Sequence, residues 1–347
     1  MSKITYKQYL RLLEDIETPD EVVEPFSIVE LGEGGFDLTF RPNLDRVELP
    51  GEDFESFSLT SFIEDSVNNA SRNGRQRRFL ARKARQESST NKLPILVSEG
   101  DSWFQFPVLI KDVIDHLEDD FLIWSIGAGG DTLENMVENP EYLDALDRFK
   151  DEVSGFLFSA AGNDIVGRNR QTRKAALFDI LKDFNGSETD IEGHINIDLF
   201  EQRIADIKEG YTTVINNIRS KPEFKNLPIF VHGYDYVYPF PGIPLDKRNP
   251  THALPNQWLG KPLDKRGILN RIQRRNILKF MIDRLYTMLE EISANPKETG
   301  VWLVDCRGAM PRVTDWADEI HGTPEGFRKV ADRFLPVISA ALEHTAN

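Results

Sequence analysis

From residue 93 onward, short apolar runs alternate with segments of helical length, and this alternation constrains the fold more than any other feature. The runs are apolar at consecutive positions, as strands covered by helices on both faces must be. The five runs are LPILVSE, DDFLIWSIG, VSGFLFSAAG, LPIFVHGY and GVWLVDCRG, starting at residues 93, 119, 153, 227 and 300. Helical patterns lie near residues 106–118, 141–150, 198–219, 268–294 and 324–343. The alternation predicts an α/β domain with a parallel sheet and right-handed crossovers, whose ligands bind at the carboxyl ends of the strands.

Residues 1–90 do not follow this alternation, and we expect them to form an N-terminal accessory extension. They contain a helical pattern near 5–16, two strand-like runs around the Gly-Gly of FSIVELGEGGFDLTF, and a second helical pattern from about residue 54. Seven of the fourteen residues 72–85 are basic. We interpret this stretch as a linker or a solvated helix face, with a phosphate or nucleic-acid contact, or a protease-sensitive joint, as the alternatives.

Residues 91–347 form the main predicted domain, and two long inserts interrupt its alternation. The inserts are residues 165–197 and 239–266, and each follows a predicted strand, so both should overhang the same edge of the sheet. Long loops in compact domains are more often functional than idle. We therefore expect lid or specificity elements here, with plain surface decoration as the alternative.

Composition and charge limit the classes of function. The chain has 347 residues, 40% of them hydrophobic, which is enough for a substantial core, and its net charge of -15 opposes general affinity for nucleic acid or anionic lipid. The single cysteine, Cys306, cannot form an intramolecular disulfide, and the histidines come without the cysteine cluster typical of zinc sites. The N-terminus lacks a secretory signal and no apolar run approaches the roughly 20 residues of a membrane span. These features predict a cytoplasmic protein without a transmembrane segment, and leave peripheral membrane contact and signal-independent export open.

Small polar residues follow the first three predicted strands. They form Gly100-Asp101-Ser102, then Gly129-Gly130-Asp131-Thr132, then Gly162-Asn163-Asp164, and WADEIHGTPEGF follows the last strand. Glycines where a strand meets a helix allow a substrate to approach the main chain, and a serine hydroxyl at the start of a helix gains from the positive end of the helix dipole. These features suit acyl transfer.

A serine nucleophile needs a base and a group that orients the base. Ser102 is the candidate nucleophile, His321 the candidate base, and Asp318, three residues before His321, the candidate orienting carboxylate. The tetrahedral intermediate also needs hydrogen-bond donors. The candidates are the backbone N–H groups of Ser102 and Gly130 and the side-chain amide of Asn163, although an amide beside glycine can also be a turn former.

The blocks SEGDSW, SIGAGGDTLENM, SAAGNDIVG and WADEIHGTPEGF together resemble the GDSL, or SGNH, hydrolase family over about residues 93–343. The resemblance implies a three-layer αβα fold with a flavodoxin-like five-stranded parallel sheet. It also implies Ser102 as nucleophile, His321 and Asp318 as base and orienting group, Gly130 and Asn163 as oxyanion donors, and no metal or organic cofactor. Trp103 stands where the family usually has a small or aliphatic residue, and the two inserts have no family counterpart that we recognise.

The expected function is therefore that of a serine esterase or lipase acting on a lipid or other acyl ester. Trp103, His232 and Tyr234 are the candidate pocket residues, since the aromatic and apolar runs around them could hold an acyl chain. Tyr234, Tyr236, Tyr238 and Trp258 would suit stacking against a sugar ring equally well. A carbohydrate O-acetyl esterase and a non-catalytic binding protein on the same fold are the alternatives. The sequence does not define the acyl or alcohol part of the substrate or the oligomeric state.

Overall fold

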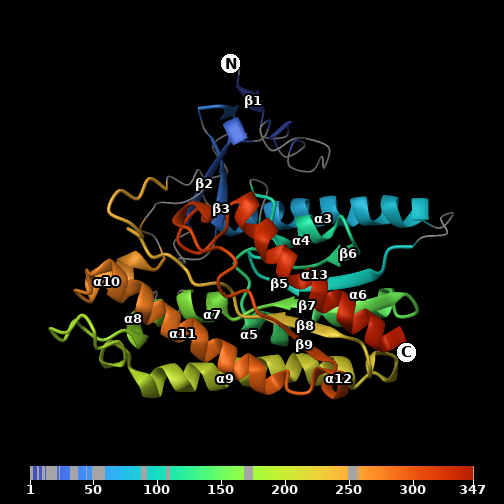
Figure 1. Ribbon diagram of the computed structural model, residues 1–347. Coiled ribbons are helices and arrows are strands. Elements are labelled where there is room, and N and C mark those ends of the chain that lie inside the picture. The colour runs from blue at the N-terminus through green and yellow to red at the C-terminus, as the bar shows by residue number, and fades with distance from the viewer. Residues whose placement is uncertain are drawn as a thin grey trace.

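The structure is a computed structural model, and its fold is shown in Figure 1. It describes residues 3–5, 8–9, 12, 22, 24–31, 38–43, 45–48, 59–86, 92–106, 110–167, 175–248, 256 and 258–346. The structural statements below concern these residues.

A five-stranded parallel sheet forms the centre of the molecule. Its strands are, in spatial order, β6 (Leu122–Ser125), β5 (Ile95–Gly100), β7 (Val153–Ser159), β8 (Ile229–His232) and β9 (Val301–Val304). Numbered along the chain within the sheet, this order is 2-1-3-4-5, which is the flavodoxin-like order. All five predicted strands are present, and the predicted fold class is confirmed.

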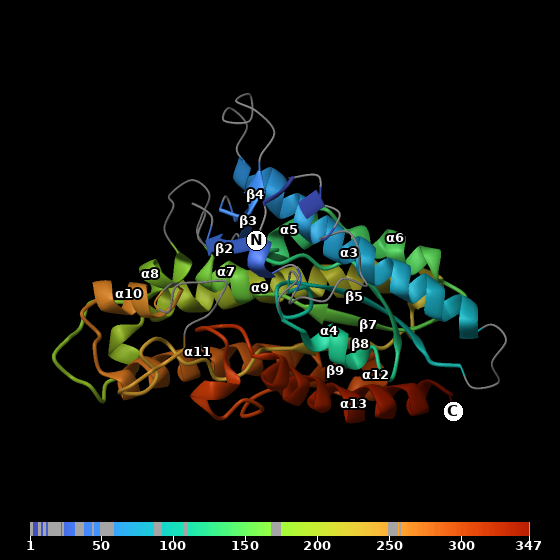
Figure 2. The same ribbon diagram turned by 90° about the horizontal axis from the view of Figure 1, so that it is seen from above.

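Helices cover both faces of the sheet (Figures 1 and 2). One layer contains α4 (Val113–Leu117) and α13 (Pro324–Ala346), which pack against each other. The other layer contains α5 (Leu133–Glu138), α6 (Glu141–Arg148), α9 (Ile197–Arg219) and α11 (Arg271–Ile292), with α9 contacting both α5 and α11. Right-handed crossovers account for this division. The chain steps from β5 to β6 toward one edge of the sheet, and then from β6 to β7, β8 and β9 toward the other edge, so the helices of the two sets of connections lie on opposite faces.

Shorter elements complete the domain. They are α7 (Gly162–Val166), α8 (Ala176–Ile180), α10 (Gly260–Lys265), α12 (Pro296–Thr299) and the 3₁₀ turns η3 (Glu192–His194), η4 (Pro222–Phe224) and η5 (Val313–Asp315). The insert 165–197 contains α8 and η3, and the insert 239–266 ends with α10. Because the two inserts follow β7 and β8, both leave the sheet at its carboxyl edge, as predicted.

The N-terminal part contains two small pairs of strands. β1 (Ile4–Thr5) pairs in parallel with β4 (Val47–Glu48), and β2 (Ser27–Leu31), preceded by the turn η1 (Glu24–Phe26), pairs antiparallel with β3 (Leu38–Pro42). The two strand-like runs of the sequence therefore form a hairpin, while the Gly-Gly turn between them and most of the predicted helix at 5–16 lie outside the described residues. The division of the chain at residue 90 stays a prediction.

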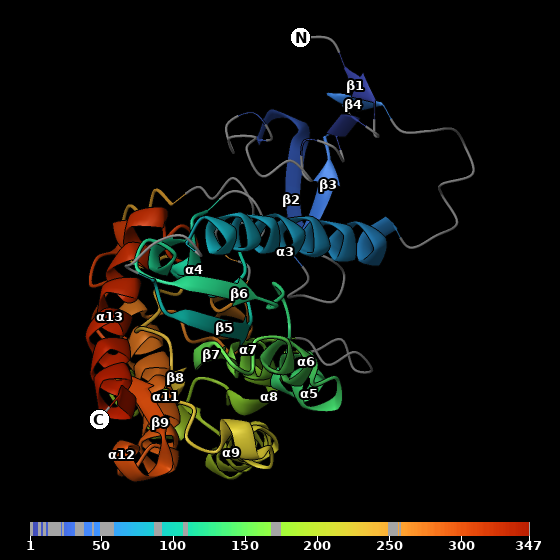
Figure 3. The same ribbon diagram turned by 90° about the vertical axis from the view of Figure 1, so that its right-hand side faces the viewer.

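The basic stretch 72–85 belongs to a 28-residue helix, α3 (Leu59–Gln86), so the interpretation as a linker is wrong. Figure 3 shows α3 lying along β6, the edge strand of the sheet. The Gln76 side chain donates a hydrogen bond from Nε2 to the carbonyl of Ser125 on β6, at 3.2 Å. The Arg75 side chain is buried, with 3% of its surface exposed. The helix therefore covers an edge that would otherwise offer unpaired backbone groups.

Side-chain caps explain where several helices begin. Asp112 accepts the N–H groups of Ile114 and Asp115 at the start of α4, and Asn270 accepts those of Ile272 and Gln273 at the start of α11. Such caps satisfy backbone donors that the first turn of a helix leaves unpaired. Among the described helices, none combines the length and apolarity that a membrane span requires.

Candidate active site

Ser102 lies on a tight turn directly after β5. The N–H groups of Phe104 and Gln105 donate to the carbonyl of Asp101, at 3.0 and 2.9 Å. The following helix, α4, begins only at Val113. The prediction that Ser102 starts a helix is wrong: the hydroxyl stands on a turn, and the next described helix begins eleven residues later.

The carboxylate of Asp101 holds this turn in place. Its Oδ1 atom accepts the N–H of Trp103 at 3.0 Å and the hydroxyl of Ser159 at 2.9 Å, while Oδ2 accepts the hydroxyl of Tyr234. The Tyr234 oxygen in turn accepts the N–H of Gly162 at 2.8 Å. Burial raises the pKa of Asp101, and the hydrogen bonds from Tyr234, Trp103 and Ser159 oppose that rise. One buried carboxylate thus joins the ends of β5, β7 and β8.

The three residues predicted to act in the chemistry lie in one chain of hydrogen bonds. Ser102 Oγ is 2.8 Å from His321 Nε2, and His321 Nδ1 is 2.8 Å from Asp318 Oδ2. The other Asp318 oxygen accepts the backbone N–H groups of Ile320 at 2.8 Å and His321 at 2.7 Å. All three side chains are buried. The imidazole therefore stands between a hydroxyl whose proton it can accept and a carboxylate that fixes its orientation.

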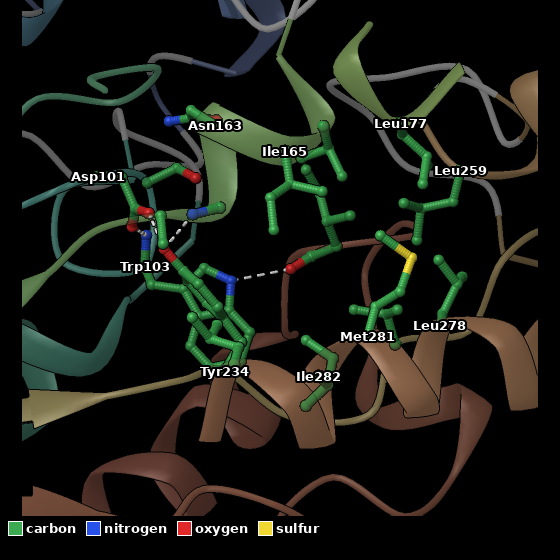
Figure 4. Close-up of a pocket in the computed structure, with 17 residues that line it drawn as sticks. Asp101, Trp103, Asn163, Ile165, Leu177, Tyr234, Leu259, Leu278, Met281 and Ile282 are labelled. Atoms are coloured by element: carbon green, nitrogen blue, oxygen red, sulfur yellow. Dashed lines mark hydrogen bonds between the residues drawn. The ribbon is translucent and has the colours of Figure 1, made fainter. Parts of the chain in front are cut away.

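Trp103 connects the turn of the nucleophile to the segment that carries His321. Its indole N–H donates to the carbonyl of Ile320 at 2.9 Å, and one side of the ring lines the pocket described below (Figure 4). The ring also makes edge contacts with Trp316 and Phe327, whose centroids lie 6.2 and 5.4 Å away. The unusual tryptophan after the serine thus connects the turn of Ser102 to the segment that carries His321.

The loop after β6 passes close to the nucleophile turn. Ala128 donates its N–H to the carbonyl of Gly100 at 2.9 Å, and a Cβ at Gly127 would lie 2.6 Å from that same oxygen. Gly130 follows in a turn with φ of +82°, a conformation that favours glycine. Within the described part of the chain, the N–H groups of Ser102 and Gly130 donate no hydrogen bond.

Asn163 lies in the first turn of α7 and reaches across to the loop after β6. Its Nδ2 atom donates to the carbonyl of Asp131 at 2.7 Å, which leaves the second N–H of the amide for another acceptor. Ala161, just before α7, has φ of +91°, and Tyr234 has φ of +66°. Left-handed backbone at residues other than glycine costs free energy and often marks functional sites.

Burial reduces the negative charge around the site. The pKa of Glu99, at the end of β5, is raised well above its usual value by burial and by the nearby carboxylate of Asp131. Burial also raises the pKa of Asp131 to about 6. Asp131 is still largely ionised at neutral pH, so the reduction in negative charge near Ser102 comes from Glu99 alone.

His232, predicted to line the pocket, lies in the core instead. Its ring is fully buried and packs between Trp103 and Phe104, with ring centroids 5.8 and 5.2 Å away, and against Phe334. Burial lowers its pKa to about 3. His232 therefore stays neutral under ordinary conditions and supports the rings beneath the nucleophile.

A narrow apolar pocket opens beside Ser102 (Figure 4). Its cavity volume is about 80 Å³. Asp101, Ser102 and Asn163 bring polar groups to its lining. Its walls are formed by aliphatic side chains: Ile165, Val166, Leu177, Val237, Leu259, Leu278, Met281, Ile282, Leu285 and Ile320. Trp103 and Tyr234, the other two candidate pocket residues, also belong to its lining.

The residues of α11 that form one wall of the pocket were not among the predicted pocket residues. Leu278, Met281, Ile282 and Leu285 recur at the spacing of one helix face, which is a signal for burial but not for a ligand. The same holds for Leu259, which comes from the insert 239–266. These positions could have been found only by knowing that α11 and the insert meet at the carboxyl edge of the sheet.

The other aromatic residues considered for sugar stacking have partners of their own. The hydroxyl of Tyr236 donates to Asp283, and that of Tyr238 donates to the carbonyl of Pro311, each at 2.5 Å. Trp258 is almost fully buried. None of the three belongs to the lining of the pocket.

The fold and the site together define a class: an αβα protein of flavodoxin-like strand order, with the Ser–His–Asp arrangement used by serine hydrolases at the carboxyl edge of its sheet. This is the fold that the resemblance to GDSL/SGNH hydrolases implied. No protein-family model matches the sequence, and the search of curated proteins found no match.

Solved structures similar to this chain include three esterases or lipases. A family 3 carbohydrate esterase of Clostridium thermocellum is 15% identical, with 74% of this chain and 100% of that chain covered and a TM-score of 0.40. An extracellular lipase of Streptomyces rimosus is 13% identical, with coverage of 72% and 99% and a TM-score of 0.41. AlinE4, an SGNH-hydrolase family esterase, is 15% identical, with coverage of 73% and 98% and a TM-score of 0.28. Likeness at this level carries no argument about the reaction or substrate of this chain.

Proposed function

We propose that this protein is a serine-dependent carboxylic ester hydrolase that forms an acyl-enzyme on Ser102. The observation that carries the proposal is the continuous hydrogen-bond chain from Ser102 through His321 to Asp318, with both distances at 2.8 Å, beside an apolar pocket that Ser102 lines. A hydroxyl, an imidazole and a carboxylate in this order are the parts that nucleophilic acyl transfer requires.

In the acylation step, His321 Nε2 takes the proton of Ser102 as Oγ attacks the ester carbonyl carbon. The carbonyl oxygen becomes an oxyanion, which accepts hydrogen bonds from the N–H groups of Ser102 and Gly130 and from the second amide N–H of Asn163. The tetrahedral intermediate then breaks its bond to the alcohol oxygen, which takes the proton from His321. Water repeats the same steps on the acyl-enzyme and releases the acid.

Asp318 holds His321 in the tautomer that this cycle needs. Its contact with Nδ1 places the proton on that nitrogen and leaves Nε2 as the acceptor. The two backbone hydrogen bonds to its other oxygen fix the carboxylate itself.

The walls of the pocket support an ester with a linear aliphatic acyl group, the lipid or acyl ester that the sequence suggested. Aliphatic side chains surround the narrow space beside Ser102 and offer few polar partners to a sugar. Each methylene buried there would contribute about 0.8 kcal/mol, or roughly fourfold in affinity. Tyr236, Tyr238 and Trp258 do not line this space, which weighs against the carbohydrate O-acetyl esterase alternative.

Labelling by a fluorophosphonate tests the nucleophile. We expect the intact mass of the wild type to rise by one adduct and the mass of Ser102→Ala to stay unchanged. Ser293→Ala is the matched control, because Ser293 is buried to the same extent, with 7% exposed, and lies at the end of α11 away from the site. It should label as the wild type does. A folded wild type without an adduct would favour the non-catalytic binding protein.

A series of p-nitrophenyl esters then tests the acyl group. We expect kcat/KM to rise at least tenfold from acetate to octanoate, since an octanoyl chain adds methylenes that the pocket can bury. A preference for acetate would contradict the acyl pocket and favour the O-acetyl esterase.

A further inference from the structure

Glu319 lies between the two residues of the proposed Asp318–His321 pair, and its carboxylate is fully buried. Four backbone N–H groups donate to it. Phe240 and Gly260 donate to Oε1 at 2.6 and 2.7 Å, and Trp258 and Leu259 donate to Oε2 at 2.7 and 2.9 Å. All four donors belong to the insert 239–266. One side chain of the segment 318–321, called the base segment because it carries His321, therefore holds residues near the beginning and near the end of this insert.

The anchored residues reach both the base and the pocket. The ring of Trp258 makes an edge contact with the His321 ring, with centroids 5.5 Å apart. The side chain of Leu259 forms part of the aliphatic wall. A movement of the segment 258–260 would therefore change the surroundings of the base and the shape of the pocket together.

A second tie joins the same two parts of the chain. Arg248 donates from Nη1 to the carbonyl of Asp318 at 2.8 Å and to that of Tyr238 at 2.9 Å. Its guanidinium is paired with Asp246 at 2.7 Å, and both side chains are almost fully buried. The insert is thus held to the base segment at three places along its length.

The chemistry of the four contacts requires a carboxylate. Its two oxygens offer about four acceptor sites and no donor, which matches four N–H groups. The amide of glutamine has the same shape but would present an NH₂ group to two backbone N–H groups. Burial raises the pKa of Glu319, and the four N–H groups, which favour the ionised form, oppose that rise.

We propose that Glu319 is a positioning residue that fixes the segment 258–260 as a built-in wall of the acyl site and couples this wall to His321. This segment then shapes the site before substrate binds, and is not a lid that must close over it. This inference rests on the proposed ester hydrolysis, but the anchoring itself can be measured without activity.

Hydrogen exchange on the wild type tests the anchoring directly. The backbone amides of Phe240 and 258–260 should exchange as slowly as those of the central strands, because all four are bonded to a buried acceptor. Exchange as fast as that of exposed amides would overturn the proposal. This measurement needs no variant and no substrate.

The variant Glu319→Gln tests the coupling, with Glu325→Gln as the matched control. Glu325 is exposed on α13, where it pairs with Arg328. In Glu319→Gln we expect faster exchange at 258–260, and a loss of kcat/KM at least tenfold larger for p-nitrophenyl octanoate than for the acetate. Glu325→Gln should match the wild type in both. An equal loss for the two esters, in a folded variant, would mean that Glu319 has only a structural role.

Glu319→Asp provides a second variant should the amide prevent folding. It keeps the charge but withdraws the carboxylate by one methylene, so it should fold and show a smaller change in the same direction. An unchanged ratio of octanoate to acetate rates would contradict the coupling. If the wild type takes no fluorophosphonate adduct, the proposed function fails and the catalytic role of Glu319 with it, while the exchange data still decide the anchoring.

Discussion

His232 shows how the surroundings of one side chain can remove its charge. Aromatic rings pack on both faces of the imidazole, and Nδ1 accepts the N–H of Tyr234 at 3.4 Å. No acidic side chain contributes to its pKa, and burial alone lowers that pKa to about 3. The folded protein therefore cannot take up the proton that the same histidine binds readily in the unfolded chain.

This difference predicts a loss of stability in mild acid. A histidine whose folded pKa is depressed contributes stability above its unfolded pKa of about 6.5, and that stability is lost as the pH falls toward the folded pKa. Between pH 7 and pH 5 we expect a loss of about 2 kcal/mol from His232. The free energy of unfolding, measured with urea at the two pH values, should fall by about 2 kcal/mol less in His232→Phe than in the wild type.

His344→Gln serves as the control for this prediction. His344 is exposed near the end of α13, so its replacement should leave the pH dependence of the wild type unchanged. Equal pH dependence in His232→Phe and the wild type would show that the buried imidazole is not responsible.

At the level of elements, α3 supports the turn of the nucleophile. Arg75 donates from Nη1 to the carbonyl of Phe104 at 2.6 Å and to the side-chain oxygen of Gln105 at 2.8 Å. Its Nη2 atom pairs with Asp112 at 2.5 Å and with Asp115 at 2.8 Å. A helix from the predicted accessory extension therefore completes the network beneath the residues that follow Ser102.

Replacing Arg75 by methionine should remove this support. The carboxylate of Asp112, which has no exposed surface, would lose its partner, and breaking such a buried pair costs roughly 3–5 kcal/mol. We expect this fall in the free energy of unfolding, together with slower fluorophosphonate labelling of Ser102. Arg85→Met, at the exposed end of the same helix, should change stability by less than about 0.5 kcal/mol. Equal labelling rates in the two variants would contradict the role of α3.

For the whole molecule, these contacts predict that α3 unfolds together with the sheet. The stretch 72–85 offers seven sites for trypsin, but Arg75 is buried and the helix packs on β6. We therefore expect cleavage in this stretch only through global unfolding, so the rate should rise with urea as the global unfolding equilibrium does. Rapid cleavage in native buffer, independent of urea, would instead support the protease-sensitive joint considered for this stretch.

The parts of the structure that the sequence predicted are those governed by local pattern. The five strands are apolar at consecutive positions, and Asp318 and His321 lie within one turn of each other, so both could be inferred without knowing the fold. The contact of Ser102 with His321 joins residues 219 positions apart, and it was predicted from the rule that strand ends share one edge.

The parts that were missed depend on contacts between distant segments. Glu319 is bonded to residues 59 to 79 positions away, and nothing in DEIH marks it as different from a surface glutamate. His232 was misplaced because a histidine at the end of a strand can point into a pocket or into the core. The basic stretch 72–85 was interpreted as a linker or a solvated helix face because the burial of Arg75 depends on Asp112 and Asp115, beyond the helix itself.

The pocket wall and the hydrogen-bond chain of the site come from different parts of the chain. Ser102 follows β5, and Asp318 and His321 follow β9, whereas most of the wall is built from α7, α8, α11 and the end of an insert. Substitutions in α8 and α11 can therefore lengthen, shorten or widen the acyl cavity without replacing the reactive groups. Proteins with this layout can differ in acyl-chain specificity while they keep the same reactive residues. For the same reason, the wall is the part of the site to change when a new specificity is designed.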